Sequence, residues 1–335
     1  MMFYGKKILI TGGTGSLGQA LTKRLLQENV ERIRIFSRNE EKQIVMENKL
    51  NDKRLRFFLG DVNDLTRMAR ALEDVDIVFH TAALKHVPKI EYNPFEAIRT
   101  NVIGSQNVID ACLHENVEKV IAISTDKAVS PLNTYGATKL LMEKLFVTAN
   151  NYVNREKHKT KFIAVRYGNV FGSSGSVIPK FIEQIKHKQT VTITDPQMTR
   201  FSITMDEALN FILKATQIGQ GSEIFVPKLK SYQINDVKNA LTEILGDYGS
   251  EITGIRPGEK LHETLINKDE IRYSWEFQDL YMITSPLYPL FHPAVISETY
   301  PGIKEINNME EYSSDKVTKI TKEELKNVIQ KSDLI

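Results

Sequence analysis

The sequence predicts an α/β protein built on a doubly wound parallel sheet, with a smaller, mainly C-terminal lobe. Segments typical of strands alternate with helix-like segments through the first half of the chain, which is the pattern of a parallel sheet covered by helices. A glycine-rich turn connects the first strand to the first helix, as in Rossmann-type folds. After about Arg166 the alternation fades, so a second unit is expected to begin there.

The elements of the first half follow from hydrophobic periodicity. Strands are expected at the short apolar runs Ile8–Thr11, Arg32–Phe36, Leu55–Leu59, Ile77–His80, Lys119–Ser124 and Phe162–Arg166. Helices are expected where apolar residues recur at helical spacing, as in Leu17–Glu28, Leu65–Leu72, Phe95–His114 and Tyr135–Asn151.

The second half is less regular. A capping box at Thr321-Lys322-Glu323-Glu324 predicts a last helix that ends near Lys331. Residues 1–166, joined by part of about 198–225, are expected to form the dinucleotide-binding domain, and about 167–197 with 226–335 the substrate-binding lobe. No elements are assigned within 268–315. The other expected elements are helices near Val177–Lys188, Met205–Thr216 and Asn235–Leu245, and strands at Val191–Thr194 and Glu223–Pro227.

Composition excludes several classes of protein. Lys+Arg 44 against Asp+Glu 42 leaves a net charge of +2, which is too balanced for a dedicated nucleic-acid binder. The single cysteine, Cys112, excludes an internal disulfide framework. The histidines lack metal-ligand spacing, so no metal site is predicted. We find no signal-peptide core and no apolar run long enough to cross a bilayer, and therefore expect a soluble cytoplasmic protein with no membrane partner.

The turn Gly12-Gly13-Thr14-Gly15-Ser16-Leu17-Gly18 follows the first strand and opens the first helix. Such a turn points backbone N–H groups at a pyrophosphate, at the positive end of the helix dipole. Gly12 would permit the turn, Gly15 would let a phosphate approach, and Gly18 would let the helix pack on the strand. The position predicts dinucleotide binding, although glycine-rich turns also occur without a ligand.

The second strand ends in Phe36-Ser37-Arg38, without the acidic residue that usually binds the ribose hydroxyls of NAD. A hydroxyl and a guanidinium suit a 2′-phosphate, so NADP is favoured over NAD. The alternative is that Arg38 is an ordinary solvated charge. Asp61-Val62 follows the third strand, where the aspartate would either meet the adenine amino group or make a turn or helix cap.

Small residues follow the fourth strand, in His80-Thr81-Ala82-Ala83, and would allow the cofactor to approach closely. Beyond them, Lys85 and His86 face either the bound molecules or solvent. Asn101 lies within a predicted helix. A buried polar side chain there needs partners, and both a structural hydrogen bond to the sheet and a catalytic relay remain open.

Tyr135 and Lys139 stand one helical turn apart on the same helix face. A nearby ammonium favours the phenolate, so Tyr135 is expected to act as a base below its usual pKa of about 10. Thr125-Asp126-Lys127, at the preceding strand end, adds a hydroxyl, an acid and an amine. Oxidation of an alcohol needs the Tyr–Lys pair, and an elimination needs an acid and a base as well. The adjacent Asp126 and Lys127 also fit an ordinary ion pair.

Together these residues resemble the extended short-chain dehydrogenase/reductases. The chain is further similar to the soluble UDP-N-acetylglucosamine 4,6-dehydratases that invert C5, the first enzymes of pseudaminic acid synthesis. Related membrane-bound enzymes that retain C5 have methionine in place of Tyr135. The resemblance covers most of residues 5–270. It lies in Ala83-Leu84-Lys85-His86-Val87-Pro88, Ser124-Thr125-Asp126-Lys127-Ala128, Arg166-Tyr167-Gly168-Asn169-Val170, Thr194-Asp195-Pro196-Gln197-Met198-Thr199-Arg200-Phe201 and Arg256-Pro257-Gly258-Glu259-Lys260-Leu261-His262-Glu263.

The resemblance implies a reaction and a role for each catalytic residue. Tyr135 would take the C4 hydroxyl proton while hydride leaves for NADP, and Thr125 would hydrogen-bond to the same oxygen. Lys127 would then remove the C5 proton, and a protonated Asp126 would donate to the departing C6 hydroxyl. Hydride would return to C6, with C5 reprotonated from the opposite face. Lys127 must be neutral for this, so its pKa is expected to fall through burial and the neighbouring Lys139 or Lys85.

The resemblance also implies a UDP-N-acetylglucosamine site and assembly into a homo-oligomer, a hexamer or a dimer. Arginines suit the diphosphate because a guanidinium can bind it through two hydrogen bonds. The candidate substrate residues are Lys85 and His86, Asn169 for the phosphates or sugar, Val177, Pro179 and Lys180 beside the nucleotide, Arg200 and Arg256 for the diphosphate, and Glu259 for a ribose hydroxyl.

Three other functions remain open. A nucleotide-sugar 4-epimerase or reductase would use Thr125, Tyr135 and Lys139 without needing the Asp126-Lys127 pair. A dehydratase that releases the 5,6-ene would use every catalytic residue. A non-catalytic NADP-binding scaffold on the same fold would be expected to lack the tyrosine or the lysine, and this chain has both.

Overall fold

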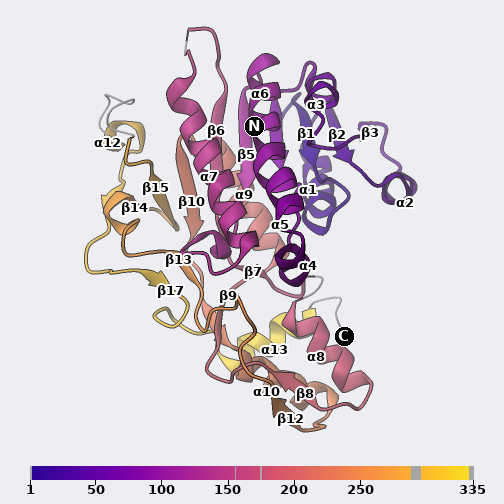
Figure 1. The fold of residues 1–335 in the computed structure, drawn as a ribbon, viewed down its shortest axis with the longest axis vertical. Helices are drawn as coiled ribbons and strands as arrows, with labels where there is room; N and C mark the ends of the chain where they lie inside the picture. The colour runs from indigo at the N-terminus through magenta and orange to yellow at the C-terminus, as the bar shows by residue number, and fades with distance from the viewer. Residues whose placement is uncertain (1, 155, 174–175, 288–295, 332–335) are drawn as a thin grey trace.

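The computed structural model describes residues 2–154, 156–173, 176–287 and 296–331 (Figure 1). Its centre is a ten-stranded sheet of order β16-β14-β15-β10-β6-β5-β4-β1-β2-β3. The strands of this sheet are β1 (Lys7–Thr11), β2 (Arg32–Ser37), β3 (Leu55–Leu59), β4 (Ile77–His80), β5 (Lys119–Ile123), β6 (Lys161–Val165), β10 (Glu223–Pro227), β14 (Ser274–Phe277), β15 (Leu280–Thr284) and β16 (Lys304–Glu305).

Helices cover both faces of the sheet, and the side chains of β1 show how. Ile8 and Ile10 pack in one core with α1 (Ser16–Leu26) and α9 (Met205–Ile218). Leu9, which points to the opposite face, packs in a second core with α3 (Leu65–Leu72), α6 (Gly104–His114) and α7 (Thr134–Tyr152). Every residue of β4 and β5 is buried, as expected for a parallel sheet covered on both sides. The predicted fold class is therefore confirmed.

The helix predicted over 95–114 is not one regular helix. It consists of α5 (Pro94–Ile98), a π-helical turn η1 (Arg99–Ile103) and α6. In the first half of the chain, the sequence does not predict α2 (Glu40–Leu50) or α4 (Val87–Tyr92). In α2 only Gln43 and Met46 are buried, so the segment carries little helical periodicity in its apolar residues.

A smaller lobe lies below the carboxyl end of the sheet in the view of Figure 1. Its core joins α8 (Val177–Lys186), α10 (Ile234–Leu245) and α13 (Lys322–Lys331). The predicted capping box is present, since Thr321 Oγ1 accepts a hydrogen bond from Glu324 N. Short strands complete the lobe and its junction with the sheet: β8 (Val191–Ile193) with β12 (Ser250–Ile252), β7 (Asn169–Val170) with β9 (Thr199–Ile203) and β11 (Ser231–Gln233), and β13 (Thr264–Ile266) with β17 (Tyr312–Ser313).

The stretch 268–315 extends the large sheet. β15 pairs antiparallel with β10, and β14 pairs antiparallel with β15. A two-residue turn at Gln278 and Asp279 joins them, with a φ of 55° at Gln278. The edge of the sheet thus contains residues that the sequence-based division places in the substrate-binding lobe. This stretch also contains the short 3-10 helix η3 (Ile271–Tyr273) and α12 (Ile296–Thr299).

Within the described ranges, no helix combines the length and the apolar character needed to cross a membrane. Nor do the described residues contain a group of three or more His, Cys, Asp or Glu side chains arranged to hold a metal ion.

Candidate active site

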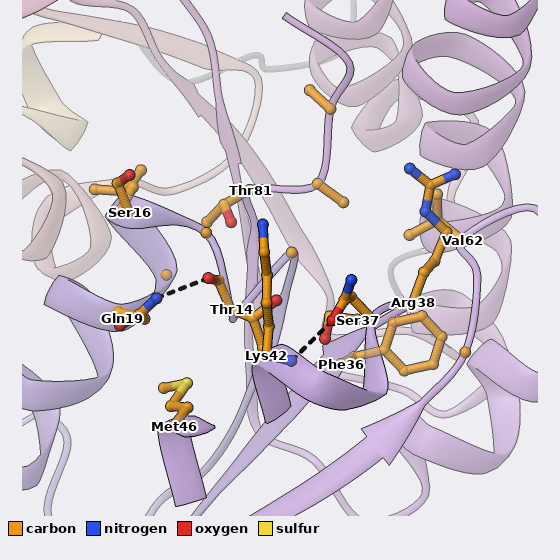
Figure 2. Close-up of a pocket in the computed structure, with 18 of the residues that line it drawn as sticks. Thr14, Ser16, Gln19, Phe36, Ser37, Arg38, Lys42, Met46, Val62 and Thr81 are labelled. Carbon is orange, nitrogen blue, oxygen red and sulfur yellow. Dashed lines mark hydrogen bonds between the residues drawn. The ribbon is translucent and has the colours of Figure 1, made fainter. Parts of the chain in front are cut away.

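A cleft of about 820 Å³ opens at the carboxyl ends of β1, β2 and β4 (Figure 2). Nearly all of the predicted cofactor residues lie around it. Those that line the cleft are Gly12, Thr14, Gly15, Ser16, Leu17, Gly18, Ser37, Arg38, Asp61, Val62, Ala82, Ala83 and Lys85.

The glycine turn has no room for side chains at two positions. Gly12 has a φ of +64°, and a Cβ there would lie 2.8 Å from the Cα of Ala82. A Cβ on Gly18 would lie 2.6 Å from the Cα of Gly13, so the helix packs directly on the turn. The N–H groups at the N-terminus of α1 therefore face the cleft, which is the arrangement that binds a pyrophosphate. The residues present fit a dinucleotide.

One end of the cleft is basic. Arg38 Nη1 lies 3.4 Å from Asp61 Oδ2, and the Arg38 side chain is 56% exposed. Asp61 Oδ1 also accepts a hydrogen bond from Asn63 N at 2.9 Å, so the aspartate does make a turn. Lys42 was not predicted, yet it lines the same cleft as Thr14 (Figure 2). Asn39 could have indicated this position, because it caps α2 and places Lys42 in the first turn of that helix.

Asn101 connects the loop after β4 to α7. Its Oδ1 accepts from Leu84 N at 2.8 Å, and its Nδ2 donates to Leu84 O at 2.9 Å and to Thr138 Oγ1 at 3.0 Å. Thr138 Oγ1 in turn donates to Tyr135 O at 2.8 Å. These contacts fix the backbone around the site, and they join Asn101 to the loop and to α7 rather than to the sheet.

Lys139 does not act on Tyr135 in the predicted way. The Lys139 ammonium is buried and donates to Ile123 O at 2.5 Å, and burial lowers the pKa of Lys139 to about 8. Burial raises the pKa of Tyr135 to about 12, against the opposing effects of the Lys127 ammonium and a hydrogen bond with Thr125. The expected fall in the pKa of Tyr135 is therefore wrong for this structure, and the cation that acts on the phenol is Lys127.

Asp126 and Lys127 form an ion pair in the short η2 helix (Asp126–Ala128) that follows β5. Lys127 Nζ donates to Asp126 Oδ1 at 3.0 Å, and Thr125 Oγ1 donates to the same oxygen at 2.7 Å. Asp126 is fully buried. Its Oδ2 is buried and has no hydrogen-bond partner among the described residues, which is uncommon for a carboxylate oxygen.

The surroundings of Lys127 keep it charged. Its Nζ also donates to Asn169 Oδ1 at 3.0 Å and lies 3.6 Å from Glu263 Oε1. Burial lowers the pKa of Lys127, but the carboxylates of Asp126 and Glu263 outweigh burial and hold it above its ordinary value. The expected fall in the pKa of Lys127 is therefore wrong, because two carboxylates rather than two lysines face the ammonium.

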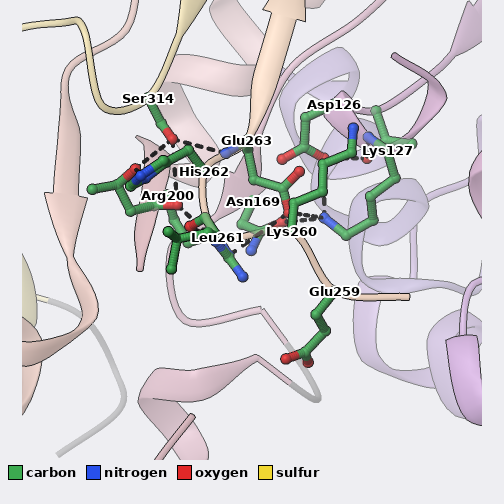
Figure 3. Close-up of polar contacts among 12 residues, drawn as sticks. Asp126, Lys127, Asn169, Arg200, Glu259, Lys260, Leu261, His262, Glu263 and Ser314 are labelled. Carbon is green, nitrogen blue, oxygen red and sulfur yellow. Dashed lines mark hydrogen bonds and ion pairs between the residues drawn. The ribbon is translucent and has the colours of Figure 1, made fainter. Parts of the chain in front are cut away.

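Glu263 and Arg200 complete this cluster (Figure 3). Arg200 Nε lies 3.7 Å from Glu263 Oε1, and Arg200 Nη1 donates to Thr199 O at 2.7 Å and Leu261 O at 3.1 Å. Glu263 was not predicted as a site residue. Glu263 is the last residue of the segment that begins at Arg256 and resembles the family. Its place in that segment could have indicated a site residue.

The other substrate candidates form a second group. Arg256 Nη1 lies 3.5 Å from Glu259 Oε1, and both act electrostatically on Lys180. Lys180 follows Val177 and Pro179 in the first turn of α8. The structure thus brings Asn169 and Arg200 to Lys127, and places Lys180, Arg256 and Glu259 near one another. Lys85 and His86 are exposed on the loop before α4.

Known proteins share much of this sequence. The inverting UDP-N-acetylglucosamine 4,6-dehydratase of Campylobacter jejuni is 48% identical over 84% of this chain and 84% of its own length. The UDP-glucose 4-epimerase of Rickettsia felis is 40% identical over 100% of this chain and 98% of its own.

Solved structures share the fold. The X-ray structure of Pen from Bacillus thuringiensis superimposes with a TM-score of 0.91, at 39% identity over 100% of both chains. DesIV, a dTDP-glucose 4,6-dehydratase of Streptomyces venezuelae solved with NAD bound, gives a TM-score of 0.68 at 22% identity over 76% of this chain and 86% of its own. At that identity the likeness to DesIV shows the fold alone.

The fold and the site define an extended short-chain dehydrogenase/reductase of the kind that modifies nucleotide sugars. The chain belongs to the polysaccharide biosynthesis protein family, whose sequence model matches residues 8–285. The resemblance to the inverting UDP-N-acetylglucosamine 4,6-dehydratases is confirmed, and the protein is an enzyme of the nucleotide-sugar dehydratase and epimerase group.

Proposed function

We propose that the protein is a UDP-N-acetylglucosamine 4,6-dehydratase that inverts C5. The product would be UDP-2-acetamido-2,6-dideoxy-β-L-arabino-hexos-4-ulose. The observation that carries the proposal is the Asp126–Lys127 ion pair, with 3.0 Å between Oδ1 and Nζ and with Asp126 fully buried, which shares one site with Thr125 and Tyr135. An acid and a base beside an alcohol-oxidising tyrosine are what a 4,6-elimination requires.

NADP is the proposed cofactor. Ser37, Arg38 and Lys42 line the same cleft as the glycine turn, and their hydroxyl and two cations suit a 2′-phosphate. Ser37 is positioned by Gln43, whose Nε2 donates to Ser37 Oγ at 3.0 Å. When bound, the nicotinamide would supply a hydride acceptor for C4 of the sugar and later a hydride donor for C6.

Tyr135 and Thr125 would act on the C4 oxygen. The Tyr135 phenol would take the C4 hydroxyl proton, and Thr125 would hold the oxygen by a hydrogen bond. Because the pKa of Tyr135 is raised to about 12, its phenolate is a strong base that needs nearby positive charge in order to form. Lys127 supplies that charge directly, whereas the Lys139 ammonium donates to the Ile123 carbonyl.

The elimination needs the Asp126–Lys127 pair in its neutral form. One proton moves from Lys127 Nζ to Asp126 Oδ1 along the existing hydrogen bond, which leaves an amine and a carboxylic acid. The amine then takes the C5 proton, the C5–H electrons form the C5=C6 bond, and the C6–O bond breaks. Asp126 gives its proton to the departing hydroxyl, which leaves as water. The ion pair is restored, so atoms and charge balance.

For the sugar nucleotide, the two groups of polar residues have distinct places. Asn169 and Arg200 lie at the catalytic cluster and would bind the sugar and its nearer phosphate. Arg256, Glu259 and Lys180 form the other group and would bind the second phosphate and the ribose.

A homo-oligomer, dimer or hexamer, is also proposed. Large apolar side chains are exposed on neighbouring helices of one face, which is typical of a protein interface. Sedimentation of the purified protein would test this, because a monomer at micromolar concentration would contradict it. The exposed side chains are Tyr92 on α4, Phe95 and Ile98 on α5, Ile103 on η1, and Leu141 and Tyr152 on α7.

A 4-epimerase is the second candidate, because the Rickettsia felis relative is named one. The direct test is proton NMR of the protein with UDP-N-acetylglucosamine in deuterated water. A new C6 methyl with deuterium at C5 and altered ring couplings would support dehydration with inversion. A methylene pair without the methyl would indicate release of the 5,6-ene. Conversion to the C4 epimer would support the second candidate.

A further inference from the structure

Glu263 lies beside Lys127 although it comes from a distant segment of the chain. Its side chain is 4% exposed, and its Oε1 lies 3.6 Å from Lys127 Nζ and 3.7 Å from Arg200 Nε. Its Oε2 has no hydrogen-bond partner among the described residues. A buried carboxylate oxygen without a partner costs free energy and is uncommon, so this position calls for a functional explanation.

The backbone of Glu263 is held firmly. Its N–H donates to Ser314 Oγ at 2.9 Å, and the N–H of Ser314 donates to Glu263 O at 2.8 Å. Ser314 Oγ also shares a hydrogen bond of 2.7 Å with Thr199 Oγ1, and Ser314 is fully buried. Figure 3 shows Ser314 and Lys127 on opposite sides of Glu263. The carboxylate is therefore placed by two other segments and not by hydrogen bonds of its own.

We propose that Glu263 is a positioning residue for the elimination step. Together with Asp126 it faces Lys127 Nζ, and it stabilises the positive charge that forms there when Lys127 takes the C5 proton. This inference rests on the proposed function, because it assumes that Lys127 is the base. Glu263 acts through Lys127 and requires no contact with the sugar.

The physical argument concerns charge before and after the proton transfer. Lys127 is neutral before it takes the C5 proton and cationic afterwards. A carboxylate at 3.6 Å favours the cation, so it makes Lys127 a stronger base. Arg200, close to the same oxygen of Glu263, keeps Glu263 charge-balanced while Lys127 is neutral. The carboxylate can thus remain ionised throughout the cycle.

Several elements contribute the charged and titratable groups around Lys127. Asp126 and Glu263 favour the ammonium, and Arg200 opposes it. Removing the charge of Glu263 therefore has a defined sign: Lys127 loses its proton more readily. The other groups that interact with Lys127 electrostatically are Tyr135 on α7, Tyr232 on β11 and Lys260 before β13.

The test is the pH dependence of the elimination in Glu263→Gln. Deuterium incorporation at C5 and formation of the C6 methyl are followed from acidic to alkaline pH with saturating UDP-N-acetylglucosamine. In the proposed mechanism the Asp126–Lys127 pair carries one proton, so the rate falls at alkaline pH once that proton is lost to solvent. In Glu263→Gln we expect this fall to occur about one pH unit lower or more, the usual effect of one charge at this distance. Binding of NADP should stay unchanged.

Two further variants sharpen the test. Glu263→Asp keeps the charge but draws it back from Lys127, so its pH profile should shift in the same direction by less. Glu118→Gln is the matched control: Glu118 pairs with Lys6 at 2.6 Å, just before β5 and at the opposite end of the sheet from the site. Its profile should match that of the native protein.

The outcomes separate the inference from the function beneath it. If the native protein forms the C6 methyl and Glu263→Gln and Glu263→Asp both keep the native pH profile, the role of Glu263 is overturned and the dehydratase stands. If the native protein forms no methyl with this substrate, the proposed function fails and the inference fails with it. If Glu263→Gln no longer binds NADP, the decision rests on Glu263→Asp alone.

Discussion

Arg166 and Glu143 form a bidentate ion pair in which both side chains are fully buried. Arg166 Nε donates to Glu143 Oε1 at 2.9 Å, and Nη2 donates to Oε2 at 2.7 Å. Nη1 and Nη2 also reach Glu270, at 2.9 and 2.8 Å. Glu143 lies one helical turn after Lys139 on α7, so these contacts link α7 to the end of β6 and to the segment before β14.

We predict that Glu143→Gln strongly destabilises the fold. The change leaves Arg166 with less opposing charge in a buried site, and breaking such pairs costs about 3–5 kcal/mol. Urea unfolding at neutral pH would measure the free energy of unfolding. As control, Glu28→Gln breaks the surface pair with Arg24 and should cost less than about 1 kcal/mol. Equal losses in the two variants would contradict the prediction.

Arg38→Ala should weaken NADP binding and leave NAD binding nearly unchanged. The guanidinium would contact only the 2′-phosphate, and a hydrogen bond to a charged group contributes about 1.5–3 kcal/mol, or roughly ten- to a hundredfold in affinity. Calorimetric titration with both cofactors measures this. Lys53→Ala, which removes an exposed lysine beyond α2, is the control. An equal loss of affinity for NAD and NADP would show that Arg38 does not contact the 2′-phosphate.

His80 should make the fold sensitive to acid. Burial, with Lys139 nearby, lowers the pKa of His80 to about 3. Below an ordinary histidine pKa of about 6.5 the unfolded chain takes up a proton that the folded protein excludes, so stability present above that pH is lost as the pH falls. Between roughly pH 6.5 and 5 this amounts to about 2 kcal/mol.

Urea unfolding of His80→Gln at both pH values tests the effect. The variant should lose about 2 kcal/mol less than the native protein over that interval, whatever its stability at neutral pH. His114→Gln is the matched control, because the His114 side chain is 77% exposed. An identical pH dependence in the native protein and His80→Gln would assign the acid sensitivity to other groups.

The sequence predicted the fold well because its signals are local. β3 and β4 have the predicted bounds, since each is a short apolar run between polar segments. The glycine turn was equally local: the positive φ of Gly12 and the close contact of Gly18 with Gly13 are needed wherever such a turn is built. The π-helical turn η1 could not be foreseen, because Asn101 bonds to a loop and to α7, which are remote in sequence.

The candidate catalytic residues Asp126, Lys127 and Tyr135 lie together as the sequence predicts, but the charges around them differ from the expected ones. From the sequence, neighbouring lysines are expected to lower the pKa of Lys127. In the folded protein, Glu263 lies beside Lys127, and Lys139 donates to the Ile123 carbonyl. The direction of a pKa shift depends on which charges lie within a few ångströms, and those come from separate segments. Lys42 was overlooked for a similar reason, since α2 has little periodicity to reveal which of its faces meets the cleft.

Tyr135→Phe should slow oxidation at C4 by at least about a hundredfold, the usual effect of losing a general base. The substitution removes only the hydroxyl, so NADP binding should persist. Single-turnover formation of the reduced nicotinamide, followed by its absorbance, isolates this step. Tyr152→Phe, on the exposed end of the same helix, provides the control. A near-native rate in Tyr135→Phe would remove Tyr135 from the role of base.

Lys127→Met should separate oxidation from elimination. The variant keeps the length of the side chain but cannot take the C5 proton, so neither the C6 methyl nor deuterium at C5 should appear. Oxidation at C4 should continue at a reduced rate, because Lys127 is also the cation that favours the Tyr135 phenolate. Reduced nicotinamide would then accumulate with a 4-keto sugar, where the native protein returns the hydride. Full dehydration by Lys127→Met would instead assign the C5 proton to another base, and the buried free oxygen of Asp126 would be the first to examine.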